Sequence, residues 1–220
     1  NFHGPGDELQ DVTEADCSRL RSLYVETGLE LAQFGVGYSE CLFDPDADVR
    51  DRVVRKIERG IEVGPSLGAD MILIRTGSLN ERGSYNPSRR NYEAGRFEQL
   101  VDTLTRVAHK AEAEGMTIVV ETHLLTIMGS PEINVQVVDA VGSDRIRVVM
   151  DFVNHFQNLD QVYASEERIN HIFDVMGHIA PIGHFKDIKF SDGLVLHIDE
   201  EVPGEGELDL VVALRRWEDL

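Results

Sequence analysis

The sequence has 220 residues, 42% of them apolar, which is enough to bury one sizeable core. With 40 acidic and 21 basic residues its formal charge is −19, so a nucleic-acid backbone would be repelled. No stretch approaches the roughly 20 apolar residues of a membrane span, the first residues do not resemble a signal peptide, and the two cysteines lack metal-type spacing. Composition therefore predicts a cytoplasmic protein with reduced thiols and argues against nucleic-acid and membrane partners.

Short β-branched runs alternate with long amphipathic stretches, which is typical of βα units and a parallel sheet. In chain order the pattern predicts helix 13–27, strand 29–36, helix 47–68, strand 70–76, helix 91–115, strand 117–123, helix 131–141, strand 146–152, helix 166–178, strand 181–188 and a last helix beginning near Glu207. No linker interrupts this alternation. We therefore predict one α/β domain over residues 1–220, a (β/α)8 TIM barrel.

The predicted barrel is incomplete at both ends. A full (β/α)8 barrel typically takes about 250 residues. The sequence carries five predicted strands and the tip of another at residues 1–3, and it stops inside a helix at residues 217–220. We expect a fragment that lacks the first and last strands. Such a sheet cannot close, so its two unpaired edges favour association into homo-oligomers.

Three successive predicted strands end in a residue type that binds metals. Glu121 stands in VVETH, Asp151 in VVMDF and His184 in IGHFKD, at separations of 30 and 33 residues. The strand ends of a βα barrel meet at one face, where two carboxylates would repel one another unless a cation or a proton compensated them. Without thiolates the set favours hard divalent ions, Mn²⁺ first, with Mg²⁺, Co²⁺ and Zn²⁺ as the other candidates. The alternative is a purely structural network.

Two further residues share the strand faces of these ligands and are candidates for catalysis. His123 follows Glu121 by two positions, and Lys186 follows His184 by two. We expect His123 to bond a substrate hydroxyl and Lys186 to stabilise a developing negative charge. The structural alternatives are a loop contact for His123 and neutralisation of the acidic barrel mouth for Lys186. Asp187 is expected to cap the loop that follows.

Four residues are candidates for binding the substrate. His3 follows the first strand tip, and Arg75 ends a predicted strand, where its guanidinium could bind a carboxylate or a phosphate in a bidentate manner. Asn154 and His155 follow Asp151 by three and four residues, and either could reach the substrate. The alternative for Arg75 is a salt bridge inside the barrel. The long loop 77–91 either covers the substrate or is surface decoration.

The ordered motifs VVETH, VVMDFVNH, IGHFKD and VPGEGELD resemble successive strand ends of the xylose-isomerase-like TIM-barrel superfamily, over the whole chain. That group includes keto-sugar epimerases, hydroxypyruvate isomerase, inosose dehydratases and type IV apurinic endonucleases. The resemblance implies that Glu121, Asp151 and His184 are metal ligands and that Glu121 also transfers a proton. It also implies a fourth ligand, a glutamate on the last strand, which the expected fragment lacks.

From this resemblance we expect a metal-dependent isomerase or epimerase that acts on a sugar or polyol through an enediolate. A related lyase of the keto-cyclitol dehydratase type begins with the same proton abstraction and stays open. An apurinic endonuclease needs additional histidines, but residues 34–36 read Phe-Gly-Val and position 154 is asparagine. A non-catalytic domain is the remaining alternative.

Overall fold

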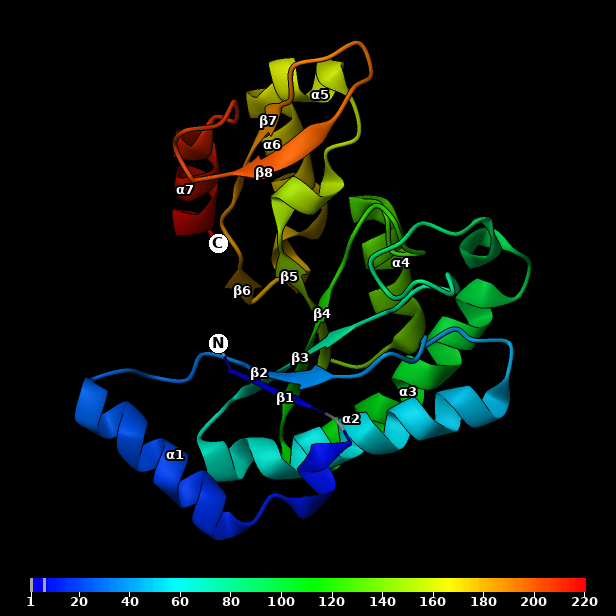
Figure 1. Cartoon of the computed structure of the whole chain (residues 1–220), viewed down its shortest axis with the longest axis vertical. Coiled ribbons are helices and arrows are strands. Elements are labelled where there is room, and N and C mark those ends of the chain that lie inside the picture. The colour runs from blue at the N-terminus through cyan, green and yellow to red at the C-terminus, as the bar shows by residue number, and fades with distance from the viewer. Residues whose placement is uncertain (1, 6) are drawn as a thin grey trace.

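The computed structural model describes residues 2–5 and 7–220, which alternate between strands and helices as predicted (Figure 1). The strands are β1 (Phe2–Pro5), β2 (Phe34–Gly37), β3 (Met71–Arg75), β4 (Thr117–Glu121), β5 (Ile146–Met150), β6 (Ile182–Gly183), β7 (Asp187–Phe190) and β8 (Ile198–Glu201). The α-helices are α1 (Glu14–Thr27), α2 (Ala47–Leu67), α3 (Arg96–Glu114), α4 (Pro131–Val141), α5 (Leu159–Tyr163), α6 (Ser165–Met176) and α7 (Leu210–Glu218). Single 3₁₀ turns occupy Glu8–Asp11, Arg89–Tyr92, Phe152–His155 and Gly177–Ile179.

Six strands form one parallel sheet in the order β1-β2-β3-β4-β5-β6. The sheet curves, and helices such as α2 and α3 cover its outer side (Figure 1). Within the described residues β1 and β6 are the two edges and do not pair with each other, so the barrel is open. This arrangement confirms the predicted incomplete TIM barrel.

The prediction of one continuous strand over 181–188 is wrong. The strand in the parallel sheet ends at Gly183, and Asp187 begins a separate antiparallel hairpin of β7 and β8. Asp187 causes the change of direction, because its buried carboxylate accepts hydrogen bonds from the backbone N–H groups of four residues: Ile188, Gly204, Gly206 and Leu208. Asp187 thus caps the following loop, as predicted.

Gly206 is required at this junction by the space available. A Cβ atom at this position would lie 2.3 Å from Oδ1 of Asp187, which is far inside van der Waals contact. Only glycine therefore allows the backbone to approach the carboxylate closely enough for the hydrogen bonds. The glycine-rich turn after β8 is thus a structural anchor for the hairpin.

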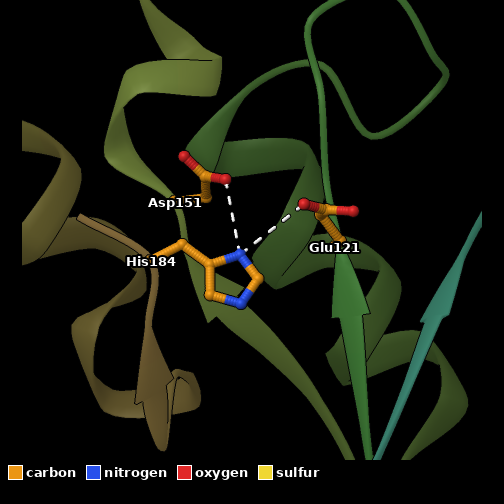
Figure 2. Close-up of side chains that lie close together, drawn as sticks. All are labelled: Glu121, Asp151 and His184. Atoms are coloured by element: carbon orange, nitrogen blue, oxygen red, sulfur yellow. Dashed lines mark ion pairs between the residues drawn. The ribbon is translucent and has the colours of Figure 1, made fainter. Parts of the chain in front are cut away.

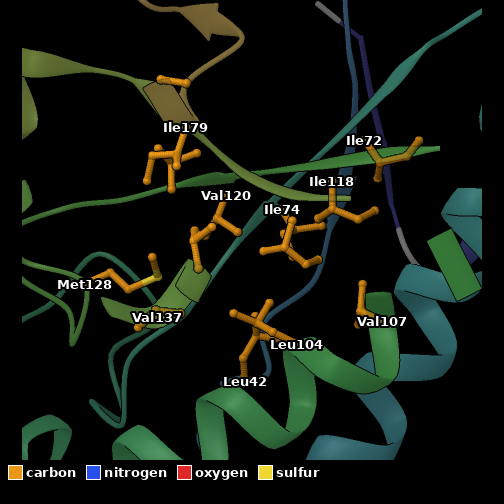
Figure 3. Close-up of a cluster of buried hydrophobic side chains, with 14 of the residues drawn as sticks. Leu42, Ile72, Ile74, Leu104, Val107, Ile118, Val120, Met128, Val137 and Ile179 are labelled. Carbon is orange, nitrogen blue, oxygen red and sulfur yellow. The ribbon is translucent and has the colours of Figure 1, made fainter. Parts of the chain in front are cut away.

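The main hydrophobic core lies between the outer face of the sheet and the helices (Figure 3). Alternate residues of the central strands point into it and are fully or almost fully buried: Ile72, Ile74, Ile118, Val120, Ile146 and Val148. Helix side chains complete the layer: Leu104, Val107 and Val137. Burial of this apolar surface is the main stabilisation of the sheet and its helices.

The helices begin at the caps that the sequence provides. Ser130 accepts a hydrogen bond from the N–H of Ile133, and Pro131 occupies the first turn of α4. Thr13 and Asp16 form a capping box at the start of α1. Within residues 2–5 and 7–220, no helix combines the length and apolarity needed to cross a membrane. Both cysteines are buried and unpaired.

Candidate metal centre

The inner face of the sheet changes from apolar to polar towards the carboxyl ends of the strands. Three inner residues of β3, β4 and β5 form a small separate cluster: Leu73, Val119 and Val149. The residues two positions further along share that face because side chains alternate along a strand. They are Arg75, Glu121 and Asp151. The regular alternation of the strands thus places charged groups together at the barrel mouth.

The structure brings together the three residues that the sequence singled out as ligands. One ligand atom each from Glu121, Asp151 and His184 lies within 4.8 Å of the other two. Figure 2 shows the imidazole between the two carboxylates, with Nδ1 of His184 3.6 Å from Oε1 of Glu121 and 3.6 Å from Oδ2 of Asp151. The backbone N–H of His184 donates to the carbonyl of Met150, which holds it beside the end of β5.

Positive side chains compensate the carboxylates of this triad. Nζ of Lys186 lies 2.8 Å from Oδ2 of the fully buried Asp151. Asp151 and then Glu121 raise the pKa of His184 to about 9, although burial acts in the opposite direction. His184 in turn lowers the pKa of Glu121, against the effects of burial and of the Asp151 charge. Burial lowers the pKa of Lys186, but Asp151, with Glu121 and Glu200, outweighs burial and the net shift is upward.

The triad fits a divalent cation. Oδ2 of Asp151 is already paired with Lys186, whereas its buried Oδ1 accepts no hydrogen bond within the described residues. A buried carboxylate oxygen of this kind is costly unless a cation approaches it. Two carboxylates and one imidazole nitrogen are a donor set suited to hard or intermediate divalent ions. Glu121, Asp151 and His184 would hold the ion.

Gln33 contacts the other nitrogen of the histidine, and sequence analysis missed it. Its Nε2 lies 2.7 Å from Nε2 of His184, and the side chain is only 2% exposed. The contact helps to hold the ring with Nδ1 towards the carboxylates. Gln33 directly precedes β2 and carries no sequence signal for this role, since 151 residues separate it from His184.

A cavity of about 200 Å³ opens beside the triad. Five of the predicted site residues line it: Arg75, Glu121, His123, Asn154 and Lys186. Tyr85 of the predicted covering loop also contributes to the wall, and so does Glu200 from the β7–β8 hairpin. His3 lies in β1, but its side chain is outside the part of the chain that the structure describes.

His123 faces the cavity as a neutral hydrogen-bond donor. Its Nδ1 accepts a hydrogen bond of 3.1 Å from the backbone N–H of Leu125. Burial, with a smaller effect of Lys186, lowers the pKa of His123, so the ring is neutral near pH 7. With Nδ1 engaged as an acceptor, the ring proton resides on Nε2.

Asn154 and His155 lie on different sides of the cavity wall because they belong to a 3₁₀ turn. Asn154 lines the cavity and donates to the backbone carbonyl of Thr122. His155 is fully buried behind the wall, where its Nε2 lies 3.1 Å from Oγ1 of Thr122 and 3.3 Å from Nδ2 of Asn134. Burial lowers the pKa of His155 to about 4. This placement gives His155 a packing contact and leaves its predicted contact with substrate without support.

The fold is shared with solved structures at low sequence identity. The 3-keto-D-glucoside 4-epimerase from E. coli aligns over 98% of this chain and 75% of its own, with a TM-score of 0.72 and 14% identity. A D-psicose 3-epimerase from Clostridium cellulolyticum H10 covers 99% of this chain and 70% of its own, with a TM-score of 0.71 and 17% identity. A xylose isomerase-like TIM barrel protein from Mycobacterium smegmatis, solved in complex with magnesium, covers 94% and 69%, with a TM-score of 0.72 and 12% identity.

A comparison with family profiles identifies the family to which the chain belongs. No curated protein sequence matches the chain. The family profile described as "Xylose isomerase-like TIM barrel" matches residues 2–217, almost the whole chain. This match agrees with the open parallel barrel and with the strand-end motifs on which the resemblance rested. The chain belongs to the xylose isomerase-like TIM barrel family.

Proposed function

We propose that the chain is a metal-dependent isomerase or epimerase that moves a proton next to the carbonyl group of a sugar or polyol, with Mn²⁺ as the preferred ion. The convergence of Glu121, Asp151 and His184 within 4.8 Å at the mouth of a barrel is the observation that carries the proposal. Two of the aligned structures are described as sugar epimerases, and one is a complex with magnesium, which supports the same chemistry.

The residues around the cavity have complementary roles in this proposal. A divalent cation at the triad would act as a Lewis acid towards two adjacent oxygens of a hydroxy-carbonyl substrate. The Glu121 carboxylate takes the proton from the carbon next to the carbonyl. The electron pair of that C–H bond forms a carbon–carbon double bond, and the carbonyl π electrons move onto oxygen, which gives an enediolate. Return of a proton to the same carbon from its other face completes epimerisation. Its return to the neighbouring carbon, together with transfer of the hydroxyl proton to the oxygen that was the carbonyl, completes isomerisation.

His123 and Lys186 stabilise the charge that develops on oxygen. The Nε2–H of His123 is directed to donate to a substrate oxygen because its Nδ1 is occupied by the Leu125 N–H. Lys186 supplies a full positive charge at the cavity wall while it pairs with Asp151. Hydrogen bonds to charged groups contribute about 1.5–3 kcal/mol each, so each residue has a measurable effect on the rate.

Solvent exchange tests the proposal. Incubation with Mn²⁺ and a ketose in deuterium oxide should place deuterium on the carbon next to the carbonyl. Glu121→Gln should lose nearly all exchange, whereas Glu132→Gln, which alters an exposed carboxylate paired with His171, should exchange at the normal rate. Metal content is measured beside exchange, because Glu121 is both ligand and base. Turnover without deuterium incorporation would exclude the enediolate mechanism, and a product that has lost water would assign the chain to lyase chemistry.

A further inference from the structure

Arg75 is the cationic side chain of the cavity that the triad does not use. It ends β3 and lines the cavity, with its side chain half-buried. The chain has nearly twice as many acidic as basic residues, and the structure contains many arginine–carboxylate pairs. Within residues 2–5 and 7–220, however, no carboxylate lies within ion-pair distance of the Arg75 guanidinium. The structural alternative predicted for this residue, a salt bridge inside the barrel, is therefore not formed among the described residues.

Two tyrosines hold Arg75 in place without using the hydrogen-bond donors of its guanidinium. The hydroxyl of Tyr38 donates to the backbone carbonyl of Arg75 at 2.6 Å and accepts from its backbone N–H at 3.0 Å. The guanidinium carbon lies 4.8 Å from the centre of the Tyr85 ring. Stacking on the ring face orients the planar group and leaves its N–H donors at the edge free for a ligand.

The surroundings of Arg75 favour an oxyanion. The hydroxyl-bearing residues Thr76 and Ser84 line the same cavity. The negative side chains of the wall, Glu121 and Glu200, both interact with the Lys186 ammonium, which partly offsets their charge. A guanidinium with adjacent hydroxyls presents the donors that carboxylate and phosphate groups accept from.

Arg75 lies close enough to the triad for one small molecule to contact both. Arg75 and Glu121 are direct partners in the register of β3 and β4. Neighbouring strands lie about 4.8 Å apart, so their inner-face side chains enter the cavity side by side. A hydroxy-carbonyl group at the triad and a negatively charged group at Arg75 therefore belong to a ligand a few carbon atoms long.

We propose that Arg75 forms an anion subsite and that the substrate is a hydroxy-carbonyl compound carrying a carboxylate or phosphate group. This inference rests on the proposed function for the identity of the reacting end. The binding of the anion itself rests on Arg75, its tyrosine supports and the cavity. Carboxylate and phosphate share the recognition chemistry, and the experiment separates them.

Three matched probes test the subsite by calorimetry on the Mn²⁺-loaded chain: dihydroxyacetone, its monophosphate, and hydroxypyruvate. At least one charged probe should bind ten-fold or more tightly than dihydroxyacetone, and the better of the two identifies the anion. Arg75→Met should weaken that probe by about 10- to 100-fold and leave dihydroxyacetone within about two-fold. Arg55→Met removes an exposed arginine of α2 and should change neither affinity. Arg75→Lys keeps the positive charge but cannot bind in a bidentate manner, so its affinity for the charged probe should be intermediate.

The outcomes separate this inference from the proposed function. Equal affinity for charged and neutral probes, or a preference that survives Arg75→Met in a chain with an unchanged melting temperature, would overturn the anion subsite. Titration of inorganic phosphate into the metal-free chain gives a second measure, and weakening by Arg75→Met is expected there too. Solvent exchange into dihydroxyacetone without any charged-probe preference would leave the isomerase standing and remove the subsite. A preference for a charged probe that depends on Arg75, without solvent exchange into any probe, would support the subsite and contradict the isomerase.

Discussion

The two faces of β3, β4 and β5 differ in character, although alternate residues of the same short strands form them. The outer face places Ile72, Ile118 and Val148 in a continuous apolar core under the helices. The inner face has a thin apolar layer and then ends in charged residues, including Glu121 and Asp151, that no hydrophobic contact explains. The comparison teaches that the apolar core rests mainly on one face, whereas the candidate metal site gathers on the other. Substitutions on the two faces should therefore affect different measurements.

The largest expected effect is on the outer face. Ile118→Ala removes a fully buried side chain of β4 and should lower the free energy of unfolding by about 2–5 kcal/mol, through lost burial and the cavity left behind. Urea denaturation followed by circular dichroism measures it. Val211→Ala on α7, where the side chain is 55% exposed, is the control and should cost less than about 0.5 kcal/mol. Equal effects of the two changes would contradict the assignment of the core.

Substitutions on the inner face should instead be detected through their effect on metal binding. An ion that binds only the folded chain stabilises it by about 2.7 kcal/mol at a concentration 100 times its Kd. Mn²⁺ should therefore raise the unfolding midpoint of the native chain, and a chelator should reverse the change. Asp151→Asn should abolish this increment, while Ile118→Ala should keep it despite its lower starting stability. Retention of the increment by Asp151→Asn would place the ion elsewhere.

A smaller effect is expected from pH, through the buried imidazole of His155. Well above pH 6.5 the ring is neutral in both the folded and the unfolded chain, so His155 causes no loss of stability there. As pH falls from 6.5 towards 4 the unfolded chain binds a proton that the folded chain resists, since burial lowers the pKa of His155 to about 4. At pH 5.5 the loss is about 1.4 kcal/mol. His155→Gln can still bond Thr122. Its free energy of unfolding should fall less between pH 7.5 and 5.5 than that of the native chain, by about 1.4 kcal/mol.

The smallest expected effect concerns the support of the anion subsite. Tyr85→Leu removes the ring beneath the Arg75 guanidinium but leaves all N–H donors in place. Cation–π contacts at exposed sites contribute about 0.5–1 kcal/mol, so affinity for the charged probe should fall by roughly two- to five-fold. The affinity for dihydroxyacetone and the melting temperature should not change. A loss as large as that of Arg75→Met would mean that Tyr85 contacts the ligand directly.

The local pattern of the sequence predicted the barrel class and the convergence of Glu121, Asp151 and His184 for the same reason. Alternation along a parallel strand determines which residue faces inward at its end, and this requires no knowledge of distant contacts. The strand pattern alone therefore puts Glu121, Asp151 and His184 at successive strand ends. In the folded chain their ligand atoms lie within 4.8 Å of one another.

Features that depend on tertiary contacts were not predicted. Gln33 meets His184 only because the curved sheet brings the start of β2 towards the end of β6. The strand predicted over 181–188 divides because the buried Asp187 carboxylate gathers N–H groups from a loop some twenty residues away. Asn154 lines the cavity and His155 does not, because a 3₁₀ turn directs adjacent side chains to different sides of the wall. Apart from the cap predicted at Asp187, none of these arrangements has a local pattern in the sequence.

The Asp187 anchor makes the β7–β8 hairpin an exchangeable module. The carboxylate ties both the start of β7 and the return of the chain after β8, so the base of the hairpin is fixed independently of its tip. The tip carries Leu194 and Val195, both well exposed, whereas Glu200 near the base lines the cavity. We therefore expect that the tip can be lengthened, shortened or replaced while Glu200 and His184 keep their positions.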